Sequence, residues 1–207
     1  MNIKTSFLIL FLLTCESSYS QGDSLRQIDS LSQVLKKPLT DTQKVETLIA
    51  LAEAYYTNAP SKAMAFCFEA KNLSEKINFQ DGLANSYGWL AFLYEQEGKI
   101  PQALEYNYKA LAISRKAKNK KDEGTILNNI AAIYKNQGKI IEALEFHQRS
   151  LKLKKEIGDK GGISSSYNNI GLIYAGQGRI ADALEYYSRS LKIEEDLNNA
   201  DEFRLRS

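Results

Sequence analysis

The stretch GKIPQALE, at residues 98–105, recurs as GKIIEALE at residues 138–145 and as GRIADALE at residues 178–185. The three copies lie 40 residues apart, and a weaker fourth copy keeps only Ala63-Met64. A fixed period of this size is typical of a solenoid, in which each unit buries its apolar face only by stacking on its neighbours. The sequence therefore predicts a repeat array that presents a binding surface.

Composition fits such an array and limits its partners. The chain has 207 residues, of which 43% are hydrophobic, so it has enough apolar material for one folded array. Lysine and arginine exceed aspartate and glutamate by 27 − 25 = 2. This small excess creates no strong field toward an acidic polymer or membrane. We expect no nucleic-acid partner.

The first twenty residues have the pattern of an export signal. Lys4 precedes the apolar run Phe7–Leu13, and Ser18-Tyr19-Ser20 offers small residues at the two positions that a signal peptidase recognises. The run is too short to span a bilayer as a helix of the mature protein. This interpretation predicts cleavage after Ser20 and a periplasmic or secreted protein.

A second interpretation of the same segment is a bacterial lipobox. Leu12-Leu13-Thr14-Cys15 resembles that motif, in which Cys15 would carry a lipid anchor and be retained. Threonine directly before the cysteine is unusual in a lipobox, so cleavage after Ser20 is favoured. Cleavage there leaves Cys67 as the only cysteine, which excludes an internal disulfide.

The rest of the chain divides into a leading helix and four repeats. Residues 21–40 predict an N-terminal capping helix and linker, ended by Pro38. Thr40 with Gln43 three residues later has the spacing of a capping box. The array covers residues 41–197, and residues 198–207 form a tail or the start of a further repeat. The expected repeats are residues 41–80, 81–120, 121–160 and 161–197.

Each repeat contains two stretches with apolar residues at helical spacing. In the last repeat, residues 164–177 precede Gly178 and residues 181–197 follow it. A glycine that ends the first stretch predicts a tight turn between two antiparallel helices. Small residues such as Gly171 would let the two helices approach closely.

This pattern resembles the tetratricopeptide repeat (TPR). The family pattern begins with a bulky residue, Leu-Gly, Tyr and Gly, and here these positions hold Tyr167, Ile170-Gly171, Tyr174 and Gly178. It continues with Ala, an aromatic residue and a small residue, and here these positions hold Ala183, Tyr187 and Ser190. The 40-residue period is similar to the variety in kinesin light chains and in extracytoplasmic sensor regions of bacterial histidine kinases. The resemblance covers about residues 41–197. It implies an all-α fold, a right-handed α-solenoid of antiparallel helix pairs (TPR superhelix).

In that family the first helix of each pair lines the inside of the superhelix. The resemblance therefore implies a groove lined by the residues of the first helices that are not needed for helix packing. These peptide-binding candidates are Asn85, Trp89, Phe92, Glu95, Asn128, Asn129, Lys135, Asn136, Ser165, Asn168, Asn169 and Leu172. A column of asparagine amides suits an extended peptide, because each amide offers a donor and an acceptor to a main chain.

The asparagines also have a structural interpretation. Adjacent asparagines can hydrogen-bond the neighbouring repeat and satisfy buried polar groups. The sequence leaves both interpretations open for Asn129 and Asn169, and favours the structural one for Asn128 and Asn168.

Other conspicuous residues suggest packing rather than chemistry. Trp89 and Phe92 suit a hydrophobic anchor, although we expect at least one of them in the core. His147 takes the position that Tyr187 holds in the next repeat, and we expect a packed aromatic substitute. Cys67 takes the same position in the first repeat, and we expect it to behave as a small hydrophobe. No nucleophile, base and orienting group come together, and one histidine with one mature cysteine cannot hold a metal. We expect no catalytic residue, metal or cofactor.

The sequence thus predicts an exported, non-enzymatic scaffold that binds a peptide or protein segment in the concave groove of the array. The alternative is the sensor portion of a bacterial signal-transduction protein whose output region is absent from this chain. The final helix, Ala181–Leu197, is expected to expose an apolar face that missing residues, a partner or self-association would cover.

Overall fold

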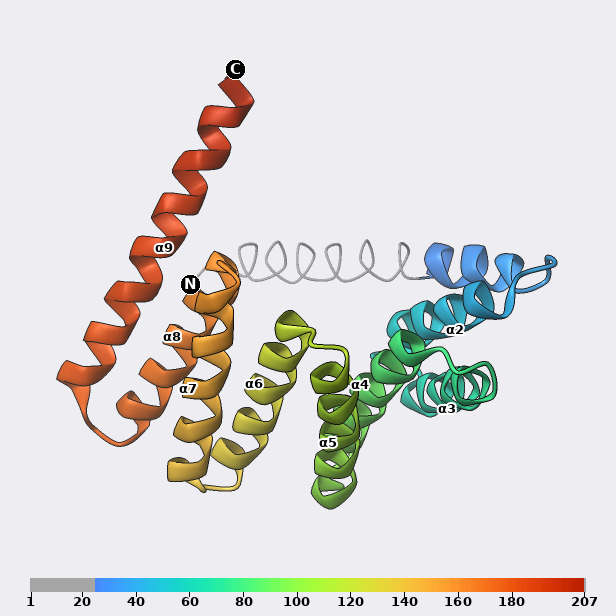
Figure 1. Ribbon diagram of the computed structural model, residues 1–207, viewed down its shortest axis with the longest axis horizontal. Coiled ribbons are helices and arrows are strands. Elements are labelled where there is room, and N and C mark those ends of the chain that lie inside the picture. The colour runs from blue at the N-terminus through green and yellow to red at the C-terminus, as the bar shows by residue number, and fades with distance from the viewer. Residues whose placement is uncertain (1–24, 207) are drawn as a thin grey trace, which may run out of the picture. The chain divides into compact units, whose positions relative to one another are not determined.

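The computed structural model describes residues 25–206, and describes side chains as far as residue 199. A helix over residues 25–34 is followed by helices joined by short turns, and within each unit consecutive helices run antiparallel (Figure 1). The described residues contain no strand, which confirms the all-α array of helix pairs. The helices are α2 (Asp41–Tyr55), α3 (Pro60–Lys76), α4 (Gln80–Gln96), α5 (Ile100–Lys116), α6 (Lys120–Asn136), α7 (Ile140–Glu156), α8 (Lys160–Gly176) and α9 (Ile180–Arg206).

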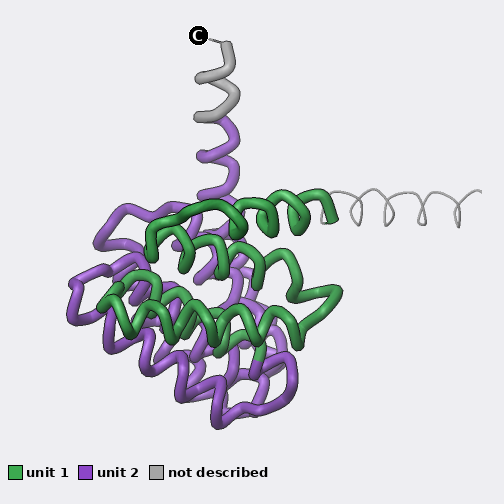
Figure 2. The backbone as a smooth tube through the Cα atoms, turned by 90° about the vertical axis from the view of Figure 1, so that its right-hand side faces the viewer, with its two compact units in different colours: residues 1–93 green, residues 94–207 purple. Residues whose placement is uncertain are grey.

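The chain forms two compact units, residues 1–93 and residues 94–207, coloured separately in Figure 2. Unit 1 contains the helix over residues 25–34, α2, α3 and most of α4. Its core gathers around Val45, Leu48 and Ala70. The expected capping box starts α2, because Thr40 Oγ1 accepts from the Gln43 amide at 3.3 Å and Gln43 Oε1 accepts from the Thr40 amide at 3.0 Å.

Unit 2 contains the end of α4 and helices α5 to α9, and these helices pack on one another in chain order. Helix α7 contacts α6 of its own repeat and α8 of the next. The expected close approach occurs at Gly171, where a Cβ would lie 2.7 Å from the Tyr187 ring. Ser150 Oγ of α7 donates to the Gly124 carbonyl of α6 at 2.6 Å. Small residues therefore bring α6 to α7, and α8 to α9, into close contact.

The glycine between the two helices of a repeat has a left-handed backbone. Gly98, Gly138 and Gly178 have φ of 72°, 73° and 73°. After Gly138, the Lys139 amide donates to the Tyr134 carbonyl at 2.9 Å, which satisfies one of the last free carbonyls of α6. A residue with a Cβ would be strained in this conformation, so the recurring glycine is explained by the turn.

Helix α9 differs from the expected end of the array. It has 27 residues, whereas α3 to α8 have 17 each, and it runs through residues 198–206 without a turn. In the preceding repeat, Gly158 has φ of 70° and lies in the turn between α7 and the next first helix, α8. The corresponding residue here is Asn198, at which α9 stays helical, whereas Asn78 and Lys118 take the left-handed conformation at the equivalent turns with φ of 56° and 55°. None of the helices described for this chain combines the length and hydropathy that crossing a membrane requires.

Candidate functional site

The candidate residues of unit 2 lie along α6 and α8. Most of their side chains are exposed, and three are half-buried. The exposed ones are Asn129, Asn136, Ser165, Asn168 and Leu172, and the half-buried ones are Asn128, Lys135 and Asn169. Two neighbouring first helices therefore present amides, a hydroxyl, an ammonium and one apolar side chain to solvent.

A hydrogen-bond network joins two of these asparagines. Asn128 Oδ1 accepts from Asn169 Nδ2 at 3.1 Å and lies 2.9 Å from His147 Nδ1. Because a carbonyl oxygen only accepts, the tautomer compatible with this bond carries its proton on His147 Nδ1. The network crosses from α6 to α7 and α8, so it fixes the Asn128 amide from two sides.

His147 at the centre of this network is buried, with 1% of its surface exposed. The pKa of His147 is lowered from 6.5 to about 4, chiefly by burial and also by the positive charges of Lys135 and Lys154. The imidazole is therefore neutral near pH 7. The sequence correctly placed His147 in the packed interior, but it did not show that the ring would be bonded to Asn128.

Glu95 extends the polar surface at the start of unit 2. Burial raises its pKa above the ordinary value for glutamate, against the lowering effects of a hydrogen bond from Asn136 and the positive charge of Lys135. The carboxylate of Glu95, the amide of Asn136 and the ammonium of Lys135 thus interact with one another at one end of α6.

The candidates of unit 1 form an aromatic cluster. The Trp89 ring centroid lies 5.7 Å from that of Phe92, and the rings are perpendicular. Tyr56 completes the cluster, 5.7 Å from Trp89 and 5.6 Å from Phe92. Trp89 is half-buried while Phe92 and Tyr56 are exposed, and Asn85 is exposed on the same helix. Sequence reasoning missed Tyr56, because it lies at the end of α2 and outside the repeated motif.

Sequence reasoning also missed a column of rings and cations in each repeat of unit 2. In the last repeat the Arg179 guanidinium lies 4.3 Å from the Tyr174 ring, Tyr174 stacks on Tyr186 at 5.4 Å, and Arg189 lies 5.6 Å from Tyr186. The other two columns are Lys99, Tyr94, Tyr106 and Lys109, and Lys139, Tyr134, Phe146 and Arg149. A cation over an aromatic face is attracted by the ring quadrupole. The basic residue after each turn glycine therefore has a structural partner.

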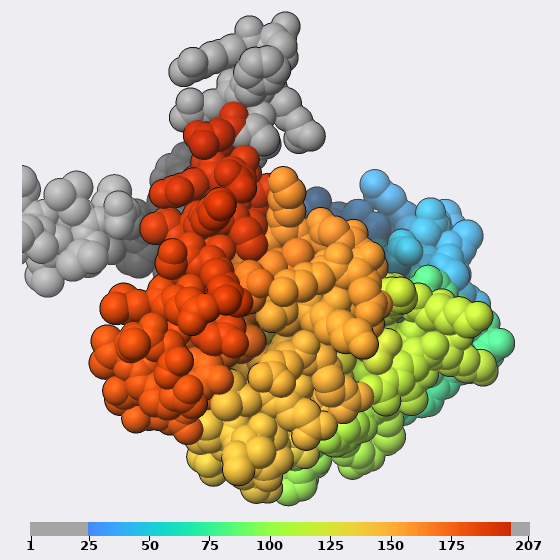
Figure 3. All heavy atoms as spheres, turned by 60° about the vertical axis from the view of Figure 1, so that its left-hand side comes forward, coloured from blue at the N-terminus to red at the C-terminus, as the bar shows by residue number. Residues whose placement is uncertain are grey.

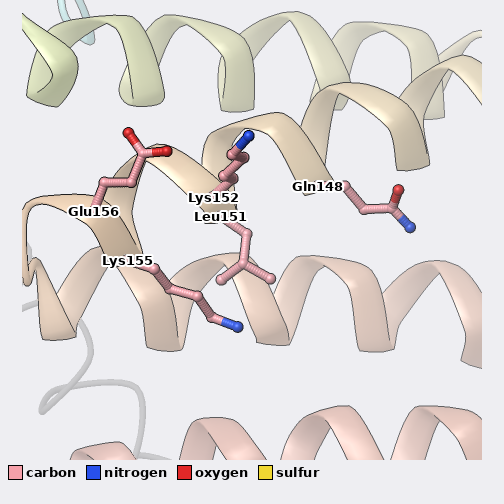
Figure 4. A pocket seen from close by; sticks show the side chains of 5 residues that line it. All are labelled: Gln148, Leu151, Lys152, Lys155 and Glu156. Carbon is pink, nitrogen blue, oxygen red and sulfur yellow. The ribbon is translucent and has the colours of Figure 1, made fainter.

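Unit 2 also has a shallow hollow of about 370 Å³ on α7 (Figure 4). All five lining side chains come from α7, and they are Gln148, Leu151, Lys152, Lys155 and Glu156. One leucine among polar groups offers little apolar area, so this hollow does not resemble a small-molecule pocket.

The described residues include potential metal ligands and one cysteine. No group of three or more His, Cys, Asp or Glu side chains gathers there to hold a metal ion. Cys67 is buried, and burial raises its pKa to about 12, which keeps the thiol protonated and unreactive.

The fold and the exposed first helices define an all-α repeat protein of the solenoid class. The family model for the tetratricopeptide repeat matches residues 82–156 and 122–196. The chain therefore belongs to the tetratricopeptide repeat family. A search of curated proteins gave no match.

Solved structures have the same fold at low sequence identity. A putative kinesin light chain from Podosopora anserina with nearly identical TPR-like repeats aligns with a TM-score of 0.67 and 18% identity, over 87% of this chain and 91% of that one. A Rap protein complexed with competence and sporulation factor has a TM-score of 0.77 and 17% identity, over 89% of this chain and 53% of that one.

A third similar structure is a STAND signal-transduction ATPase with a tetratricopeptide repeat sensor, from Pyrococcus horikoshii. It aligns with a TM-score of 0.76 and 23% identity. The alignment covers 89% of this chain and 29% of that one. The chain thus spans about half the length of the Rap protein and less than a third of the ATPase.

Proposed function

We propose that this chain is an exported, non-enzymatic interaction protein that binds a peptide or protein segment along α6 and α8. The observation that carries the proposal is the alignment of exposed polar groups on these two first helices beside a fixed amide pair. Asn128 and Asn169 are only half-buried, and the network that joins them holds their orientation. Preorganised amides can bind a main chain without losing side-chain freedom.

Several groups of this surface match an extended segment. Asn129, Asn168 and Ser165 are exposed and offer hydrogen bonds, and Leu172 is an exposed apolar contact on the same helix as Ser165. An extended main chain has alternating donors and acceptors, which amide side chains can meet at either atom. The composition of residues 1–20, which lie outside the described residues, supports export.

A peptide selection tests the binding site. A displayed library of extended peptides would be selected on the chain beginning at Gln21, and the enriched peptides would be measured by calorimetry. Replacing Asn129 and Asn169 together by alanine should weaken binding at least tenfold, whereas Gln148→Ala, at an exposed position of the α7 hollow, should leave it unchanged. Equal affinity for the double variant and the Gln148→Ala control would contradict the proposed site.

A second candidate is the sensor part of a signalling protein. The Pyrococcus structure contains a tetratricopeptide repeat sensor, and the present chain aligns with 29% of that protein. Examining the genomic sequence downstream of Ser207 for an in-frame continuation would distinguish the two candidates. A continuation into a membrane helix and an output domain favours the sensor.

A further inference from the structure

The second helices of unit 2 share a face that the next first helix covers. On α5 this face includes Tyr108, Leu111 and Arg115. Tyr108 Oη lies 3.1 Å from Tyr134 Oη of α6, and Arg115 Nε lies 2.8 Å from Glu123 Oε1 of α6. Leu111 between them is only 3% exposed. Helix α6 therefore covers this face of α5.

The same face of α7 meets α8. Lys155, which corresponds to Arg115, places Nζ 5.2 Å from the centroid of the Tyr167 ring. Lys154 Nζ donates to Ser166 Oγ at 3.3 Å. Leu151 is half-buried, as the hollow in Figure 4 lies beside it. Two successive second helices thus use equivalent positions to contact the next repeat.

On α9 the equivalent side chains have no described helix over them. We call these residues the open face, and they are Ile180, Leu184, Ser188, Leu191 and Glu195. Leu184 is 61% exposed and Leu191 is 56% exposed, compared with 3% for Leu111. Figure 3 shows α9, in red, on the side of unit 2 turned toward the viewer. Because α9 continues as a helix to Arg206, the described chain does not fold back over this face.

We propose that the open face binds the open face of a second copy of this chain, with the two α9 helices antiparallel. The spacing of the open face is self-complementary. Its five residues follow one another at intervals of 4, 4, 3 and 4 positions, so they lie on one side of the helix. Leu184 and Leu191 are therefore two turns apart. A two-fold axis between residues 187 and 188 places Leu184 of each protomer against Leu191 of the other. Each of the two leucines is then covered by a leucine of the other protomer, as α6 covers Leu111 of α5.

The charges along α9 select the antiparallel orientation. Glu195 and Asp196 make the later part of the helix acidic, while Glu194 of the same run accepts from Ser164 Oγ of α8 at 2.7 Å. Arg179, which pairs with Asp182 at 2.7 Å, precedes the first residue of α9. An antiparallel pair places this acidic segment beside Arg179 and the positive end of the helix dipole of the other copy. A parallel pair would instead bring the two acidic segments together, which is unfavourable.

The size of the open face predicts a weak dimer. Three exposed apolar residues on one helix bury less area than the roughly 1,600 Å² of a standard interface, so we expect dissociation in roughly the micromolar range. Ser188 lies next to the two-fold axis and is small, so it allows the two helices to approach closely.

Sedimentation equilibrium tests the association. The chain beginning at Gln21 would be measured from roughly 5 to 500 μM, a range that brackets the weak dimer expected from the small interface. We expect a monomer–dimer equilibrium that Leu184→Glu with Leu191→Glu shifts at least tenfold toward monomer. Ile141→Glu is the matched control, because Ile141 is 82% exposed but lies outside the open face. A monomer at every concentration, or a dimer that the double variant leaves intact, overturns the proposal, provided circular dichroism shows unchanged helix content.

Cysteine cross-linking tests the orientation and the occupant. The native Cys67 is buried and does not compete. Under mild oxidation, Ser188→Cys should form a covalent dimer, and Leu184→Cys combined with Leu191→Cys should do so as well. Leu191→Cys alone should not, because the two copies of residue 191 lie far apart in an antiparallel pair. Cross-linking of Leu191→Cys alone would show a parallel pair, and none of the variants cross-linking would show a different occupant, so both results contradict the proposal.

Discussion

Asn169 of α8 donates a hydrogen bond to Asn128 of α6, with 3.1 Å between Nδ2 and Oδ1. The two residues belong to successive repeats and are 41 positions apart in the sequence. Because His147 of α7 bonds the same oxygen, Asn128 Oδ1 is a single acceptor that links α6 to both α7 and α8.

Replacing Asn128 by alanine should therefore destabilise the fold. The substitution leaves the buried His147 Nδ1 without its acceptor, and an unsatisfied buried group costs about 1–3 kcal/mol. We expect that loss in the free energy of unfolding measured with urea. Asn129→Ala is the control, because Asn129 is exposed and should change stability by less than about 0.5 kcal/mol. Equal stability of the two variants would mean that the network contributes nothing.

The low pKa of His147 predicts a dependence of stability on pH. The folded pKa is about 4 and the ordinary value is 6.5, so the unfolded state binds more protons between these values. Stability should rise as pH increases from 4 to 6.5 and be unaffected by this residue above that range. The contribution is of the order of 3 kcal/mol for complete protonation of the unfolded chain.

The matched variant for this test is His147→Asn, because Asn107 takes the equivalent position in α5. Unfolding free energies of the two proteins would be compared at several pH values between 4 and 8. The difference between them should change with pH only below about 6.5. Parallel curves across the whole range would show that His147 titrates normally in the folded protein.

Gly138→Ala should lower stability by about 1 kcal/mol, because φ of 73° strains a residue with a Cβ. Gly176→Ala is the control. Gly176 is helical with ordinary φ, and its Cβ would meet nothing within 4 Å, so alanine there should be neutral or slightly stabilising. Thermal unfolding would measure both, and an equal change in melting temperature would contradict the explanation of the recurring glycine.

The leader makes a prediction about the mature N-terminus. Expression of the whole chain in a Gram-negative host, followed by fractionation and intact-mass measurement, should give a periplasmic protein that begins at Gln21. A membrane-bound product that begins at a lipidated Cys15 would instead support the lipobox. Full-length chain retained in the cytoplasm would contradict both interpretations of residues 1–20.

The sequence predicted the helix pairs well because their determinants are local and repeated. Gly138 and the alternation of large and small residues recur at a fixed spacing, so each repeat supports the assignment of the next. The capping box at Thr40 was likewise legible from two residues. These features depend on neighbours in the chain, which a single sequence shows directly.

The site was less predictable because its contacts join distant positions. The bond from Asn169 to Asn128 and the ring of His147 depend on how three helices pack, and no short pattern encodes that arrangement. The continuation of α9 to Arg206 was not predictable either, because the sequence left residues 198–207 open as a tail or the start of a further repeat.

The ring-and-cation columns have a consequence for how this protein meets charged molecules. Each column holds two basic side chains over aromatic faces, and Glu105 and Glu185 pair with Lys109 and Arg189 one turn away. An anion that approached this edge would have to compete with partners already in place. Counting lysines and arginines therefore overstates the attraction that unit 2 exerts on a polyanion.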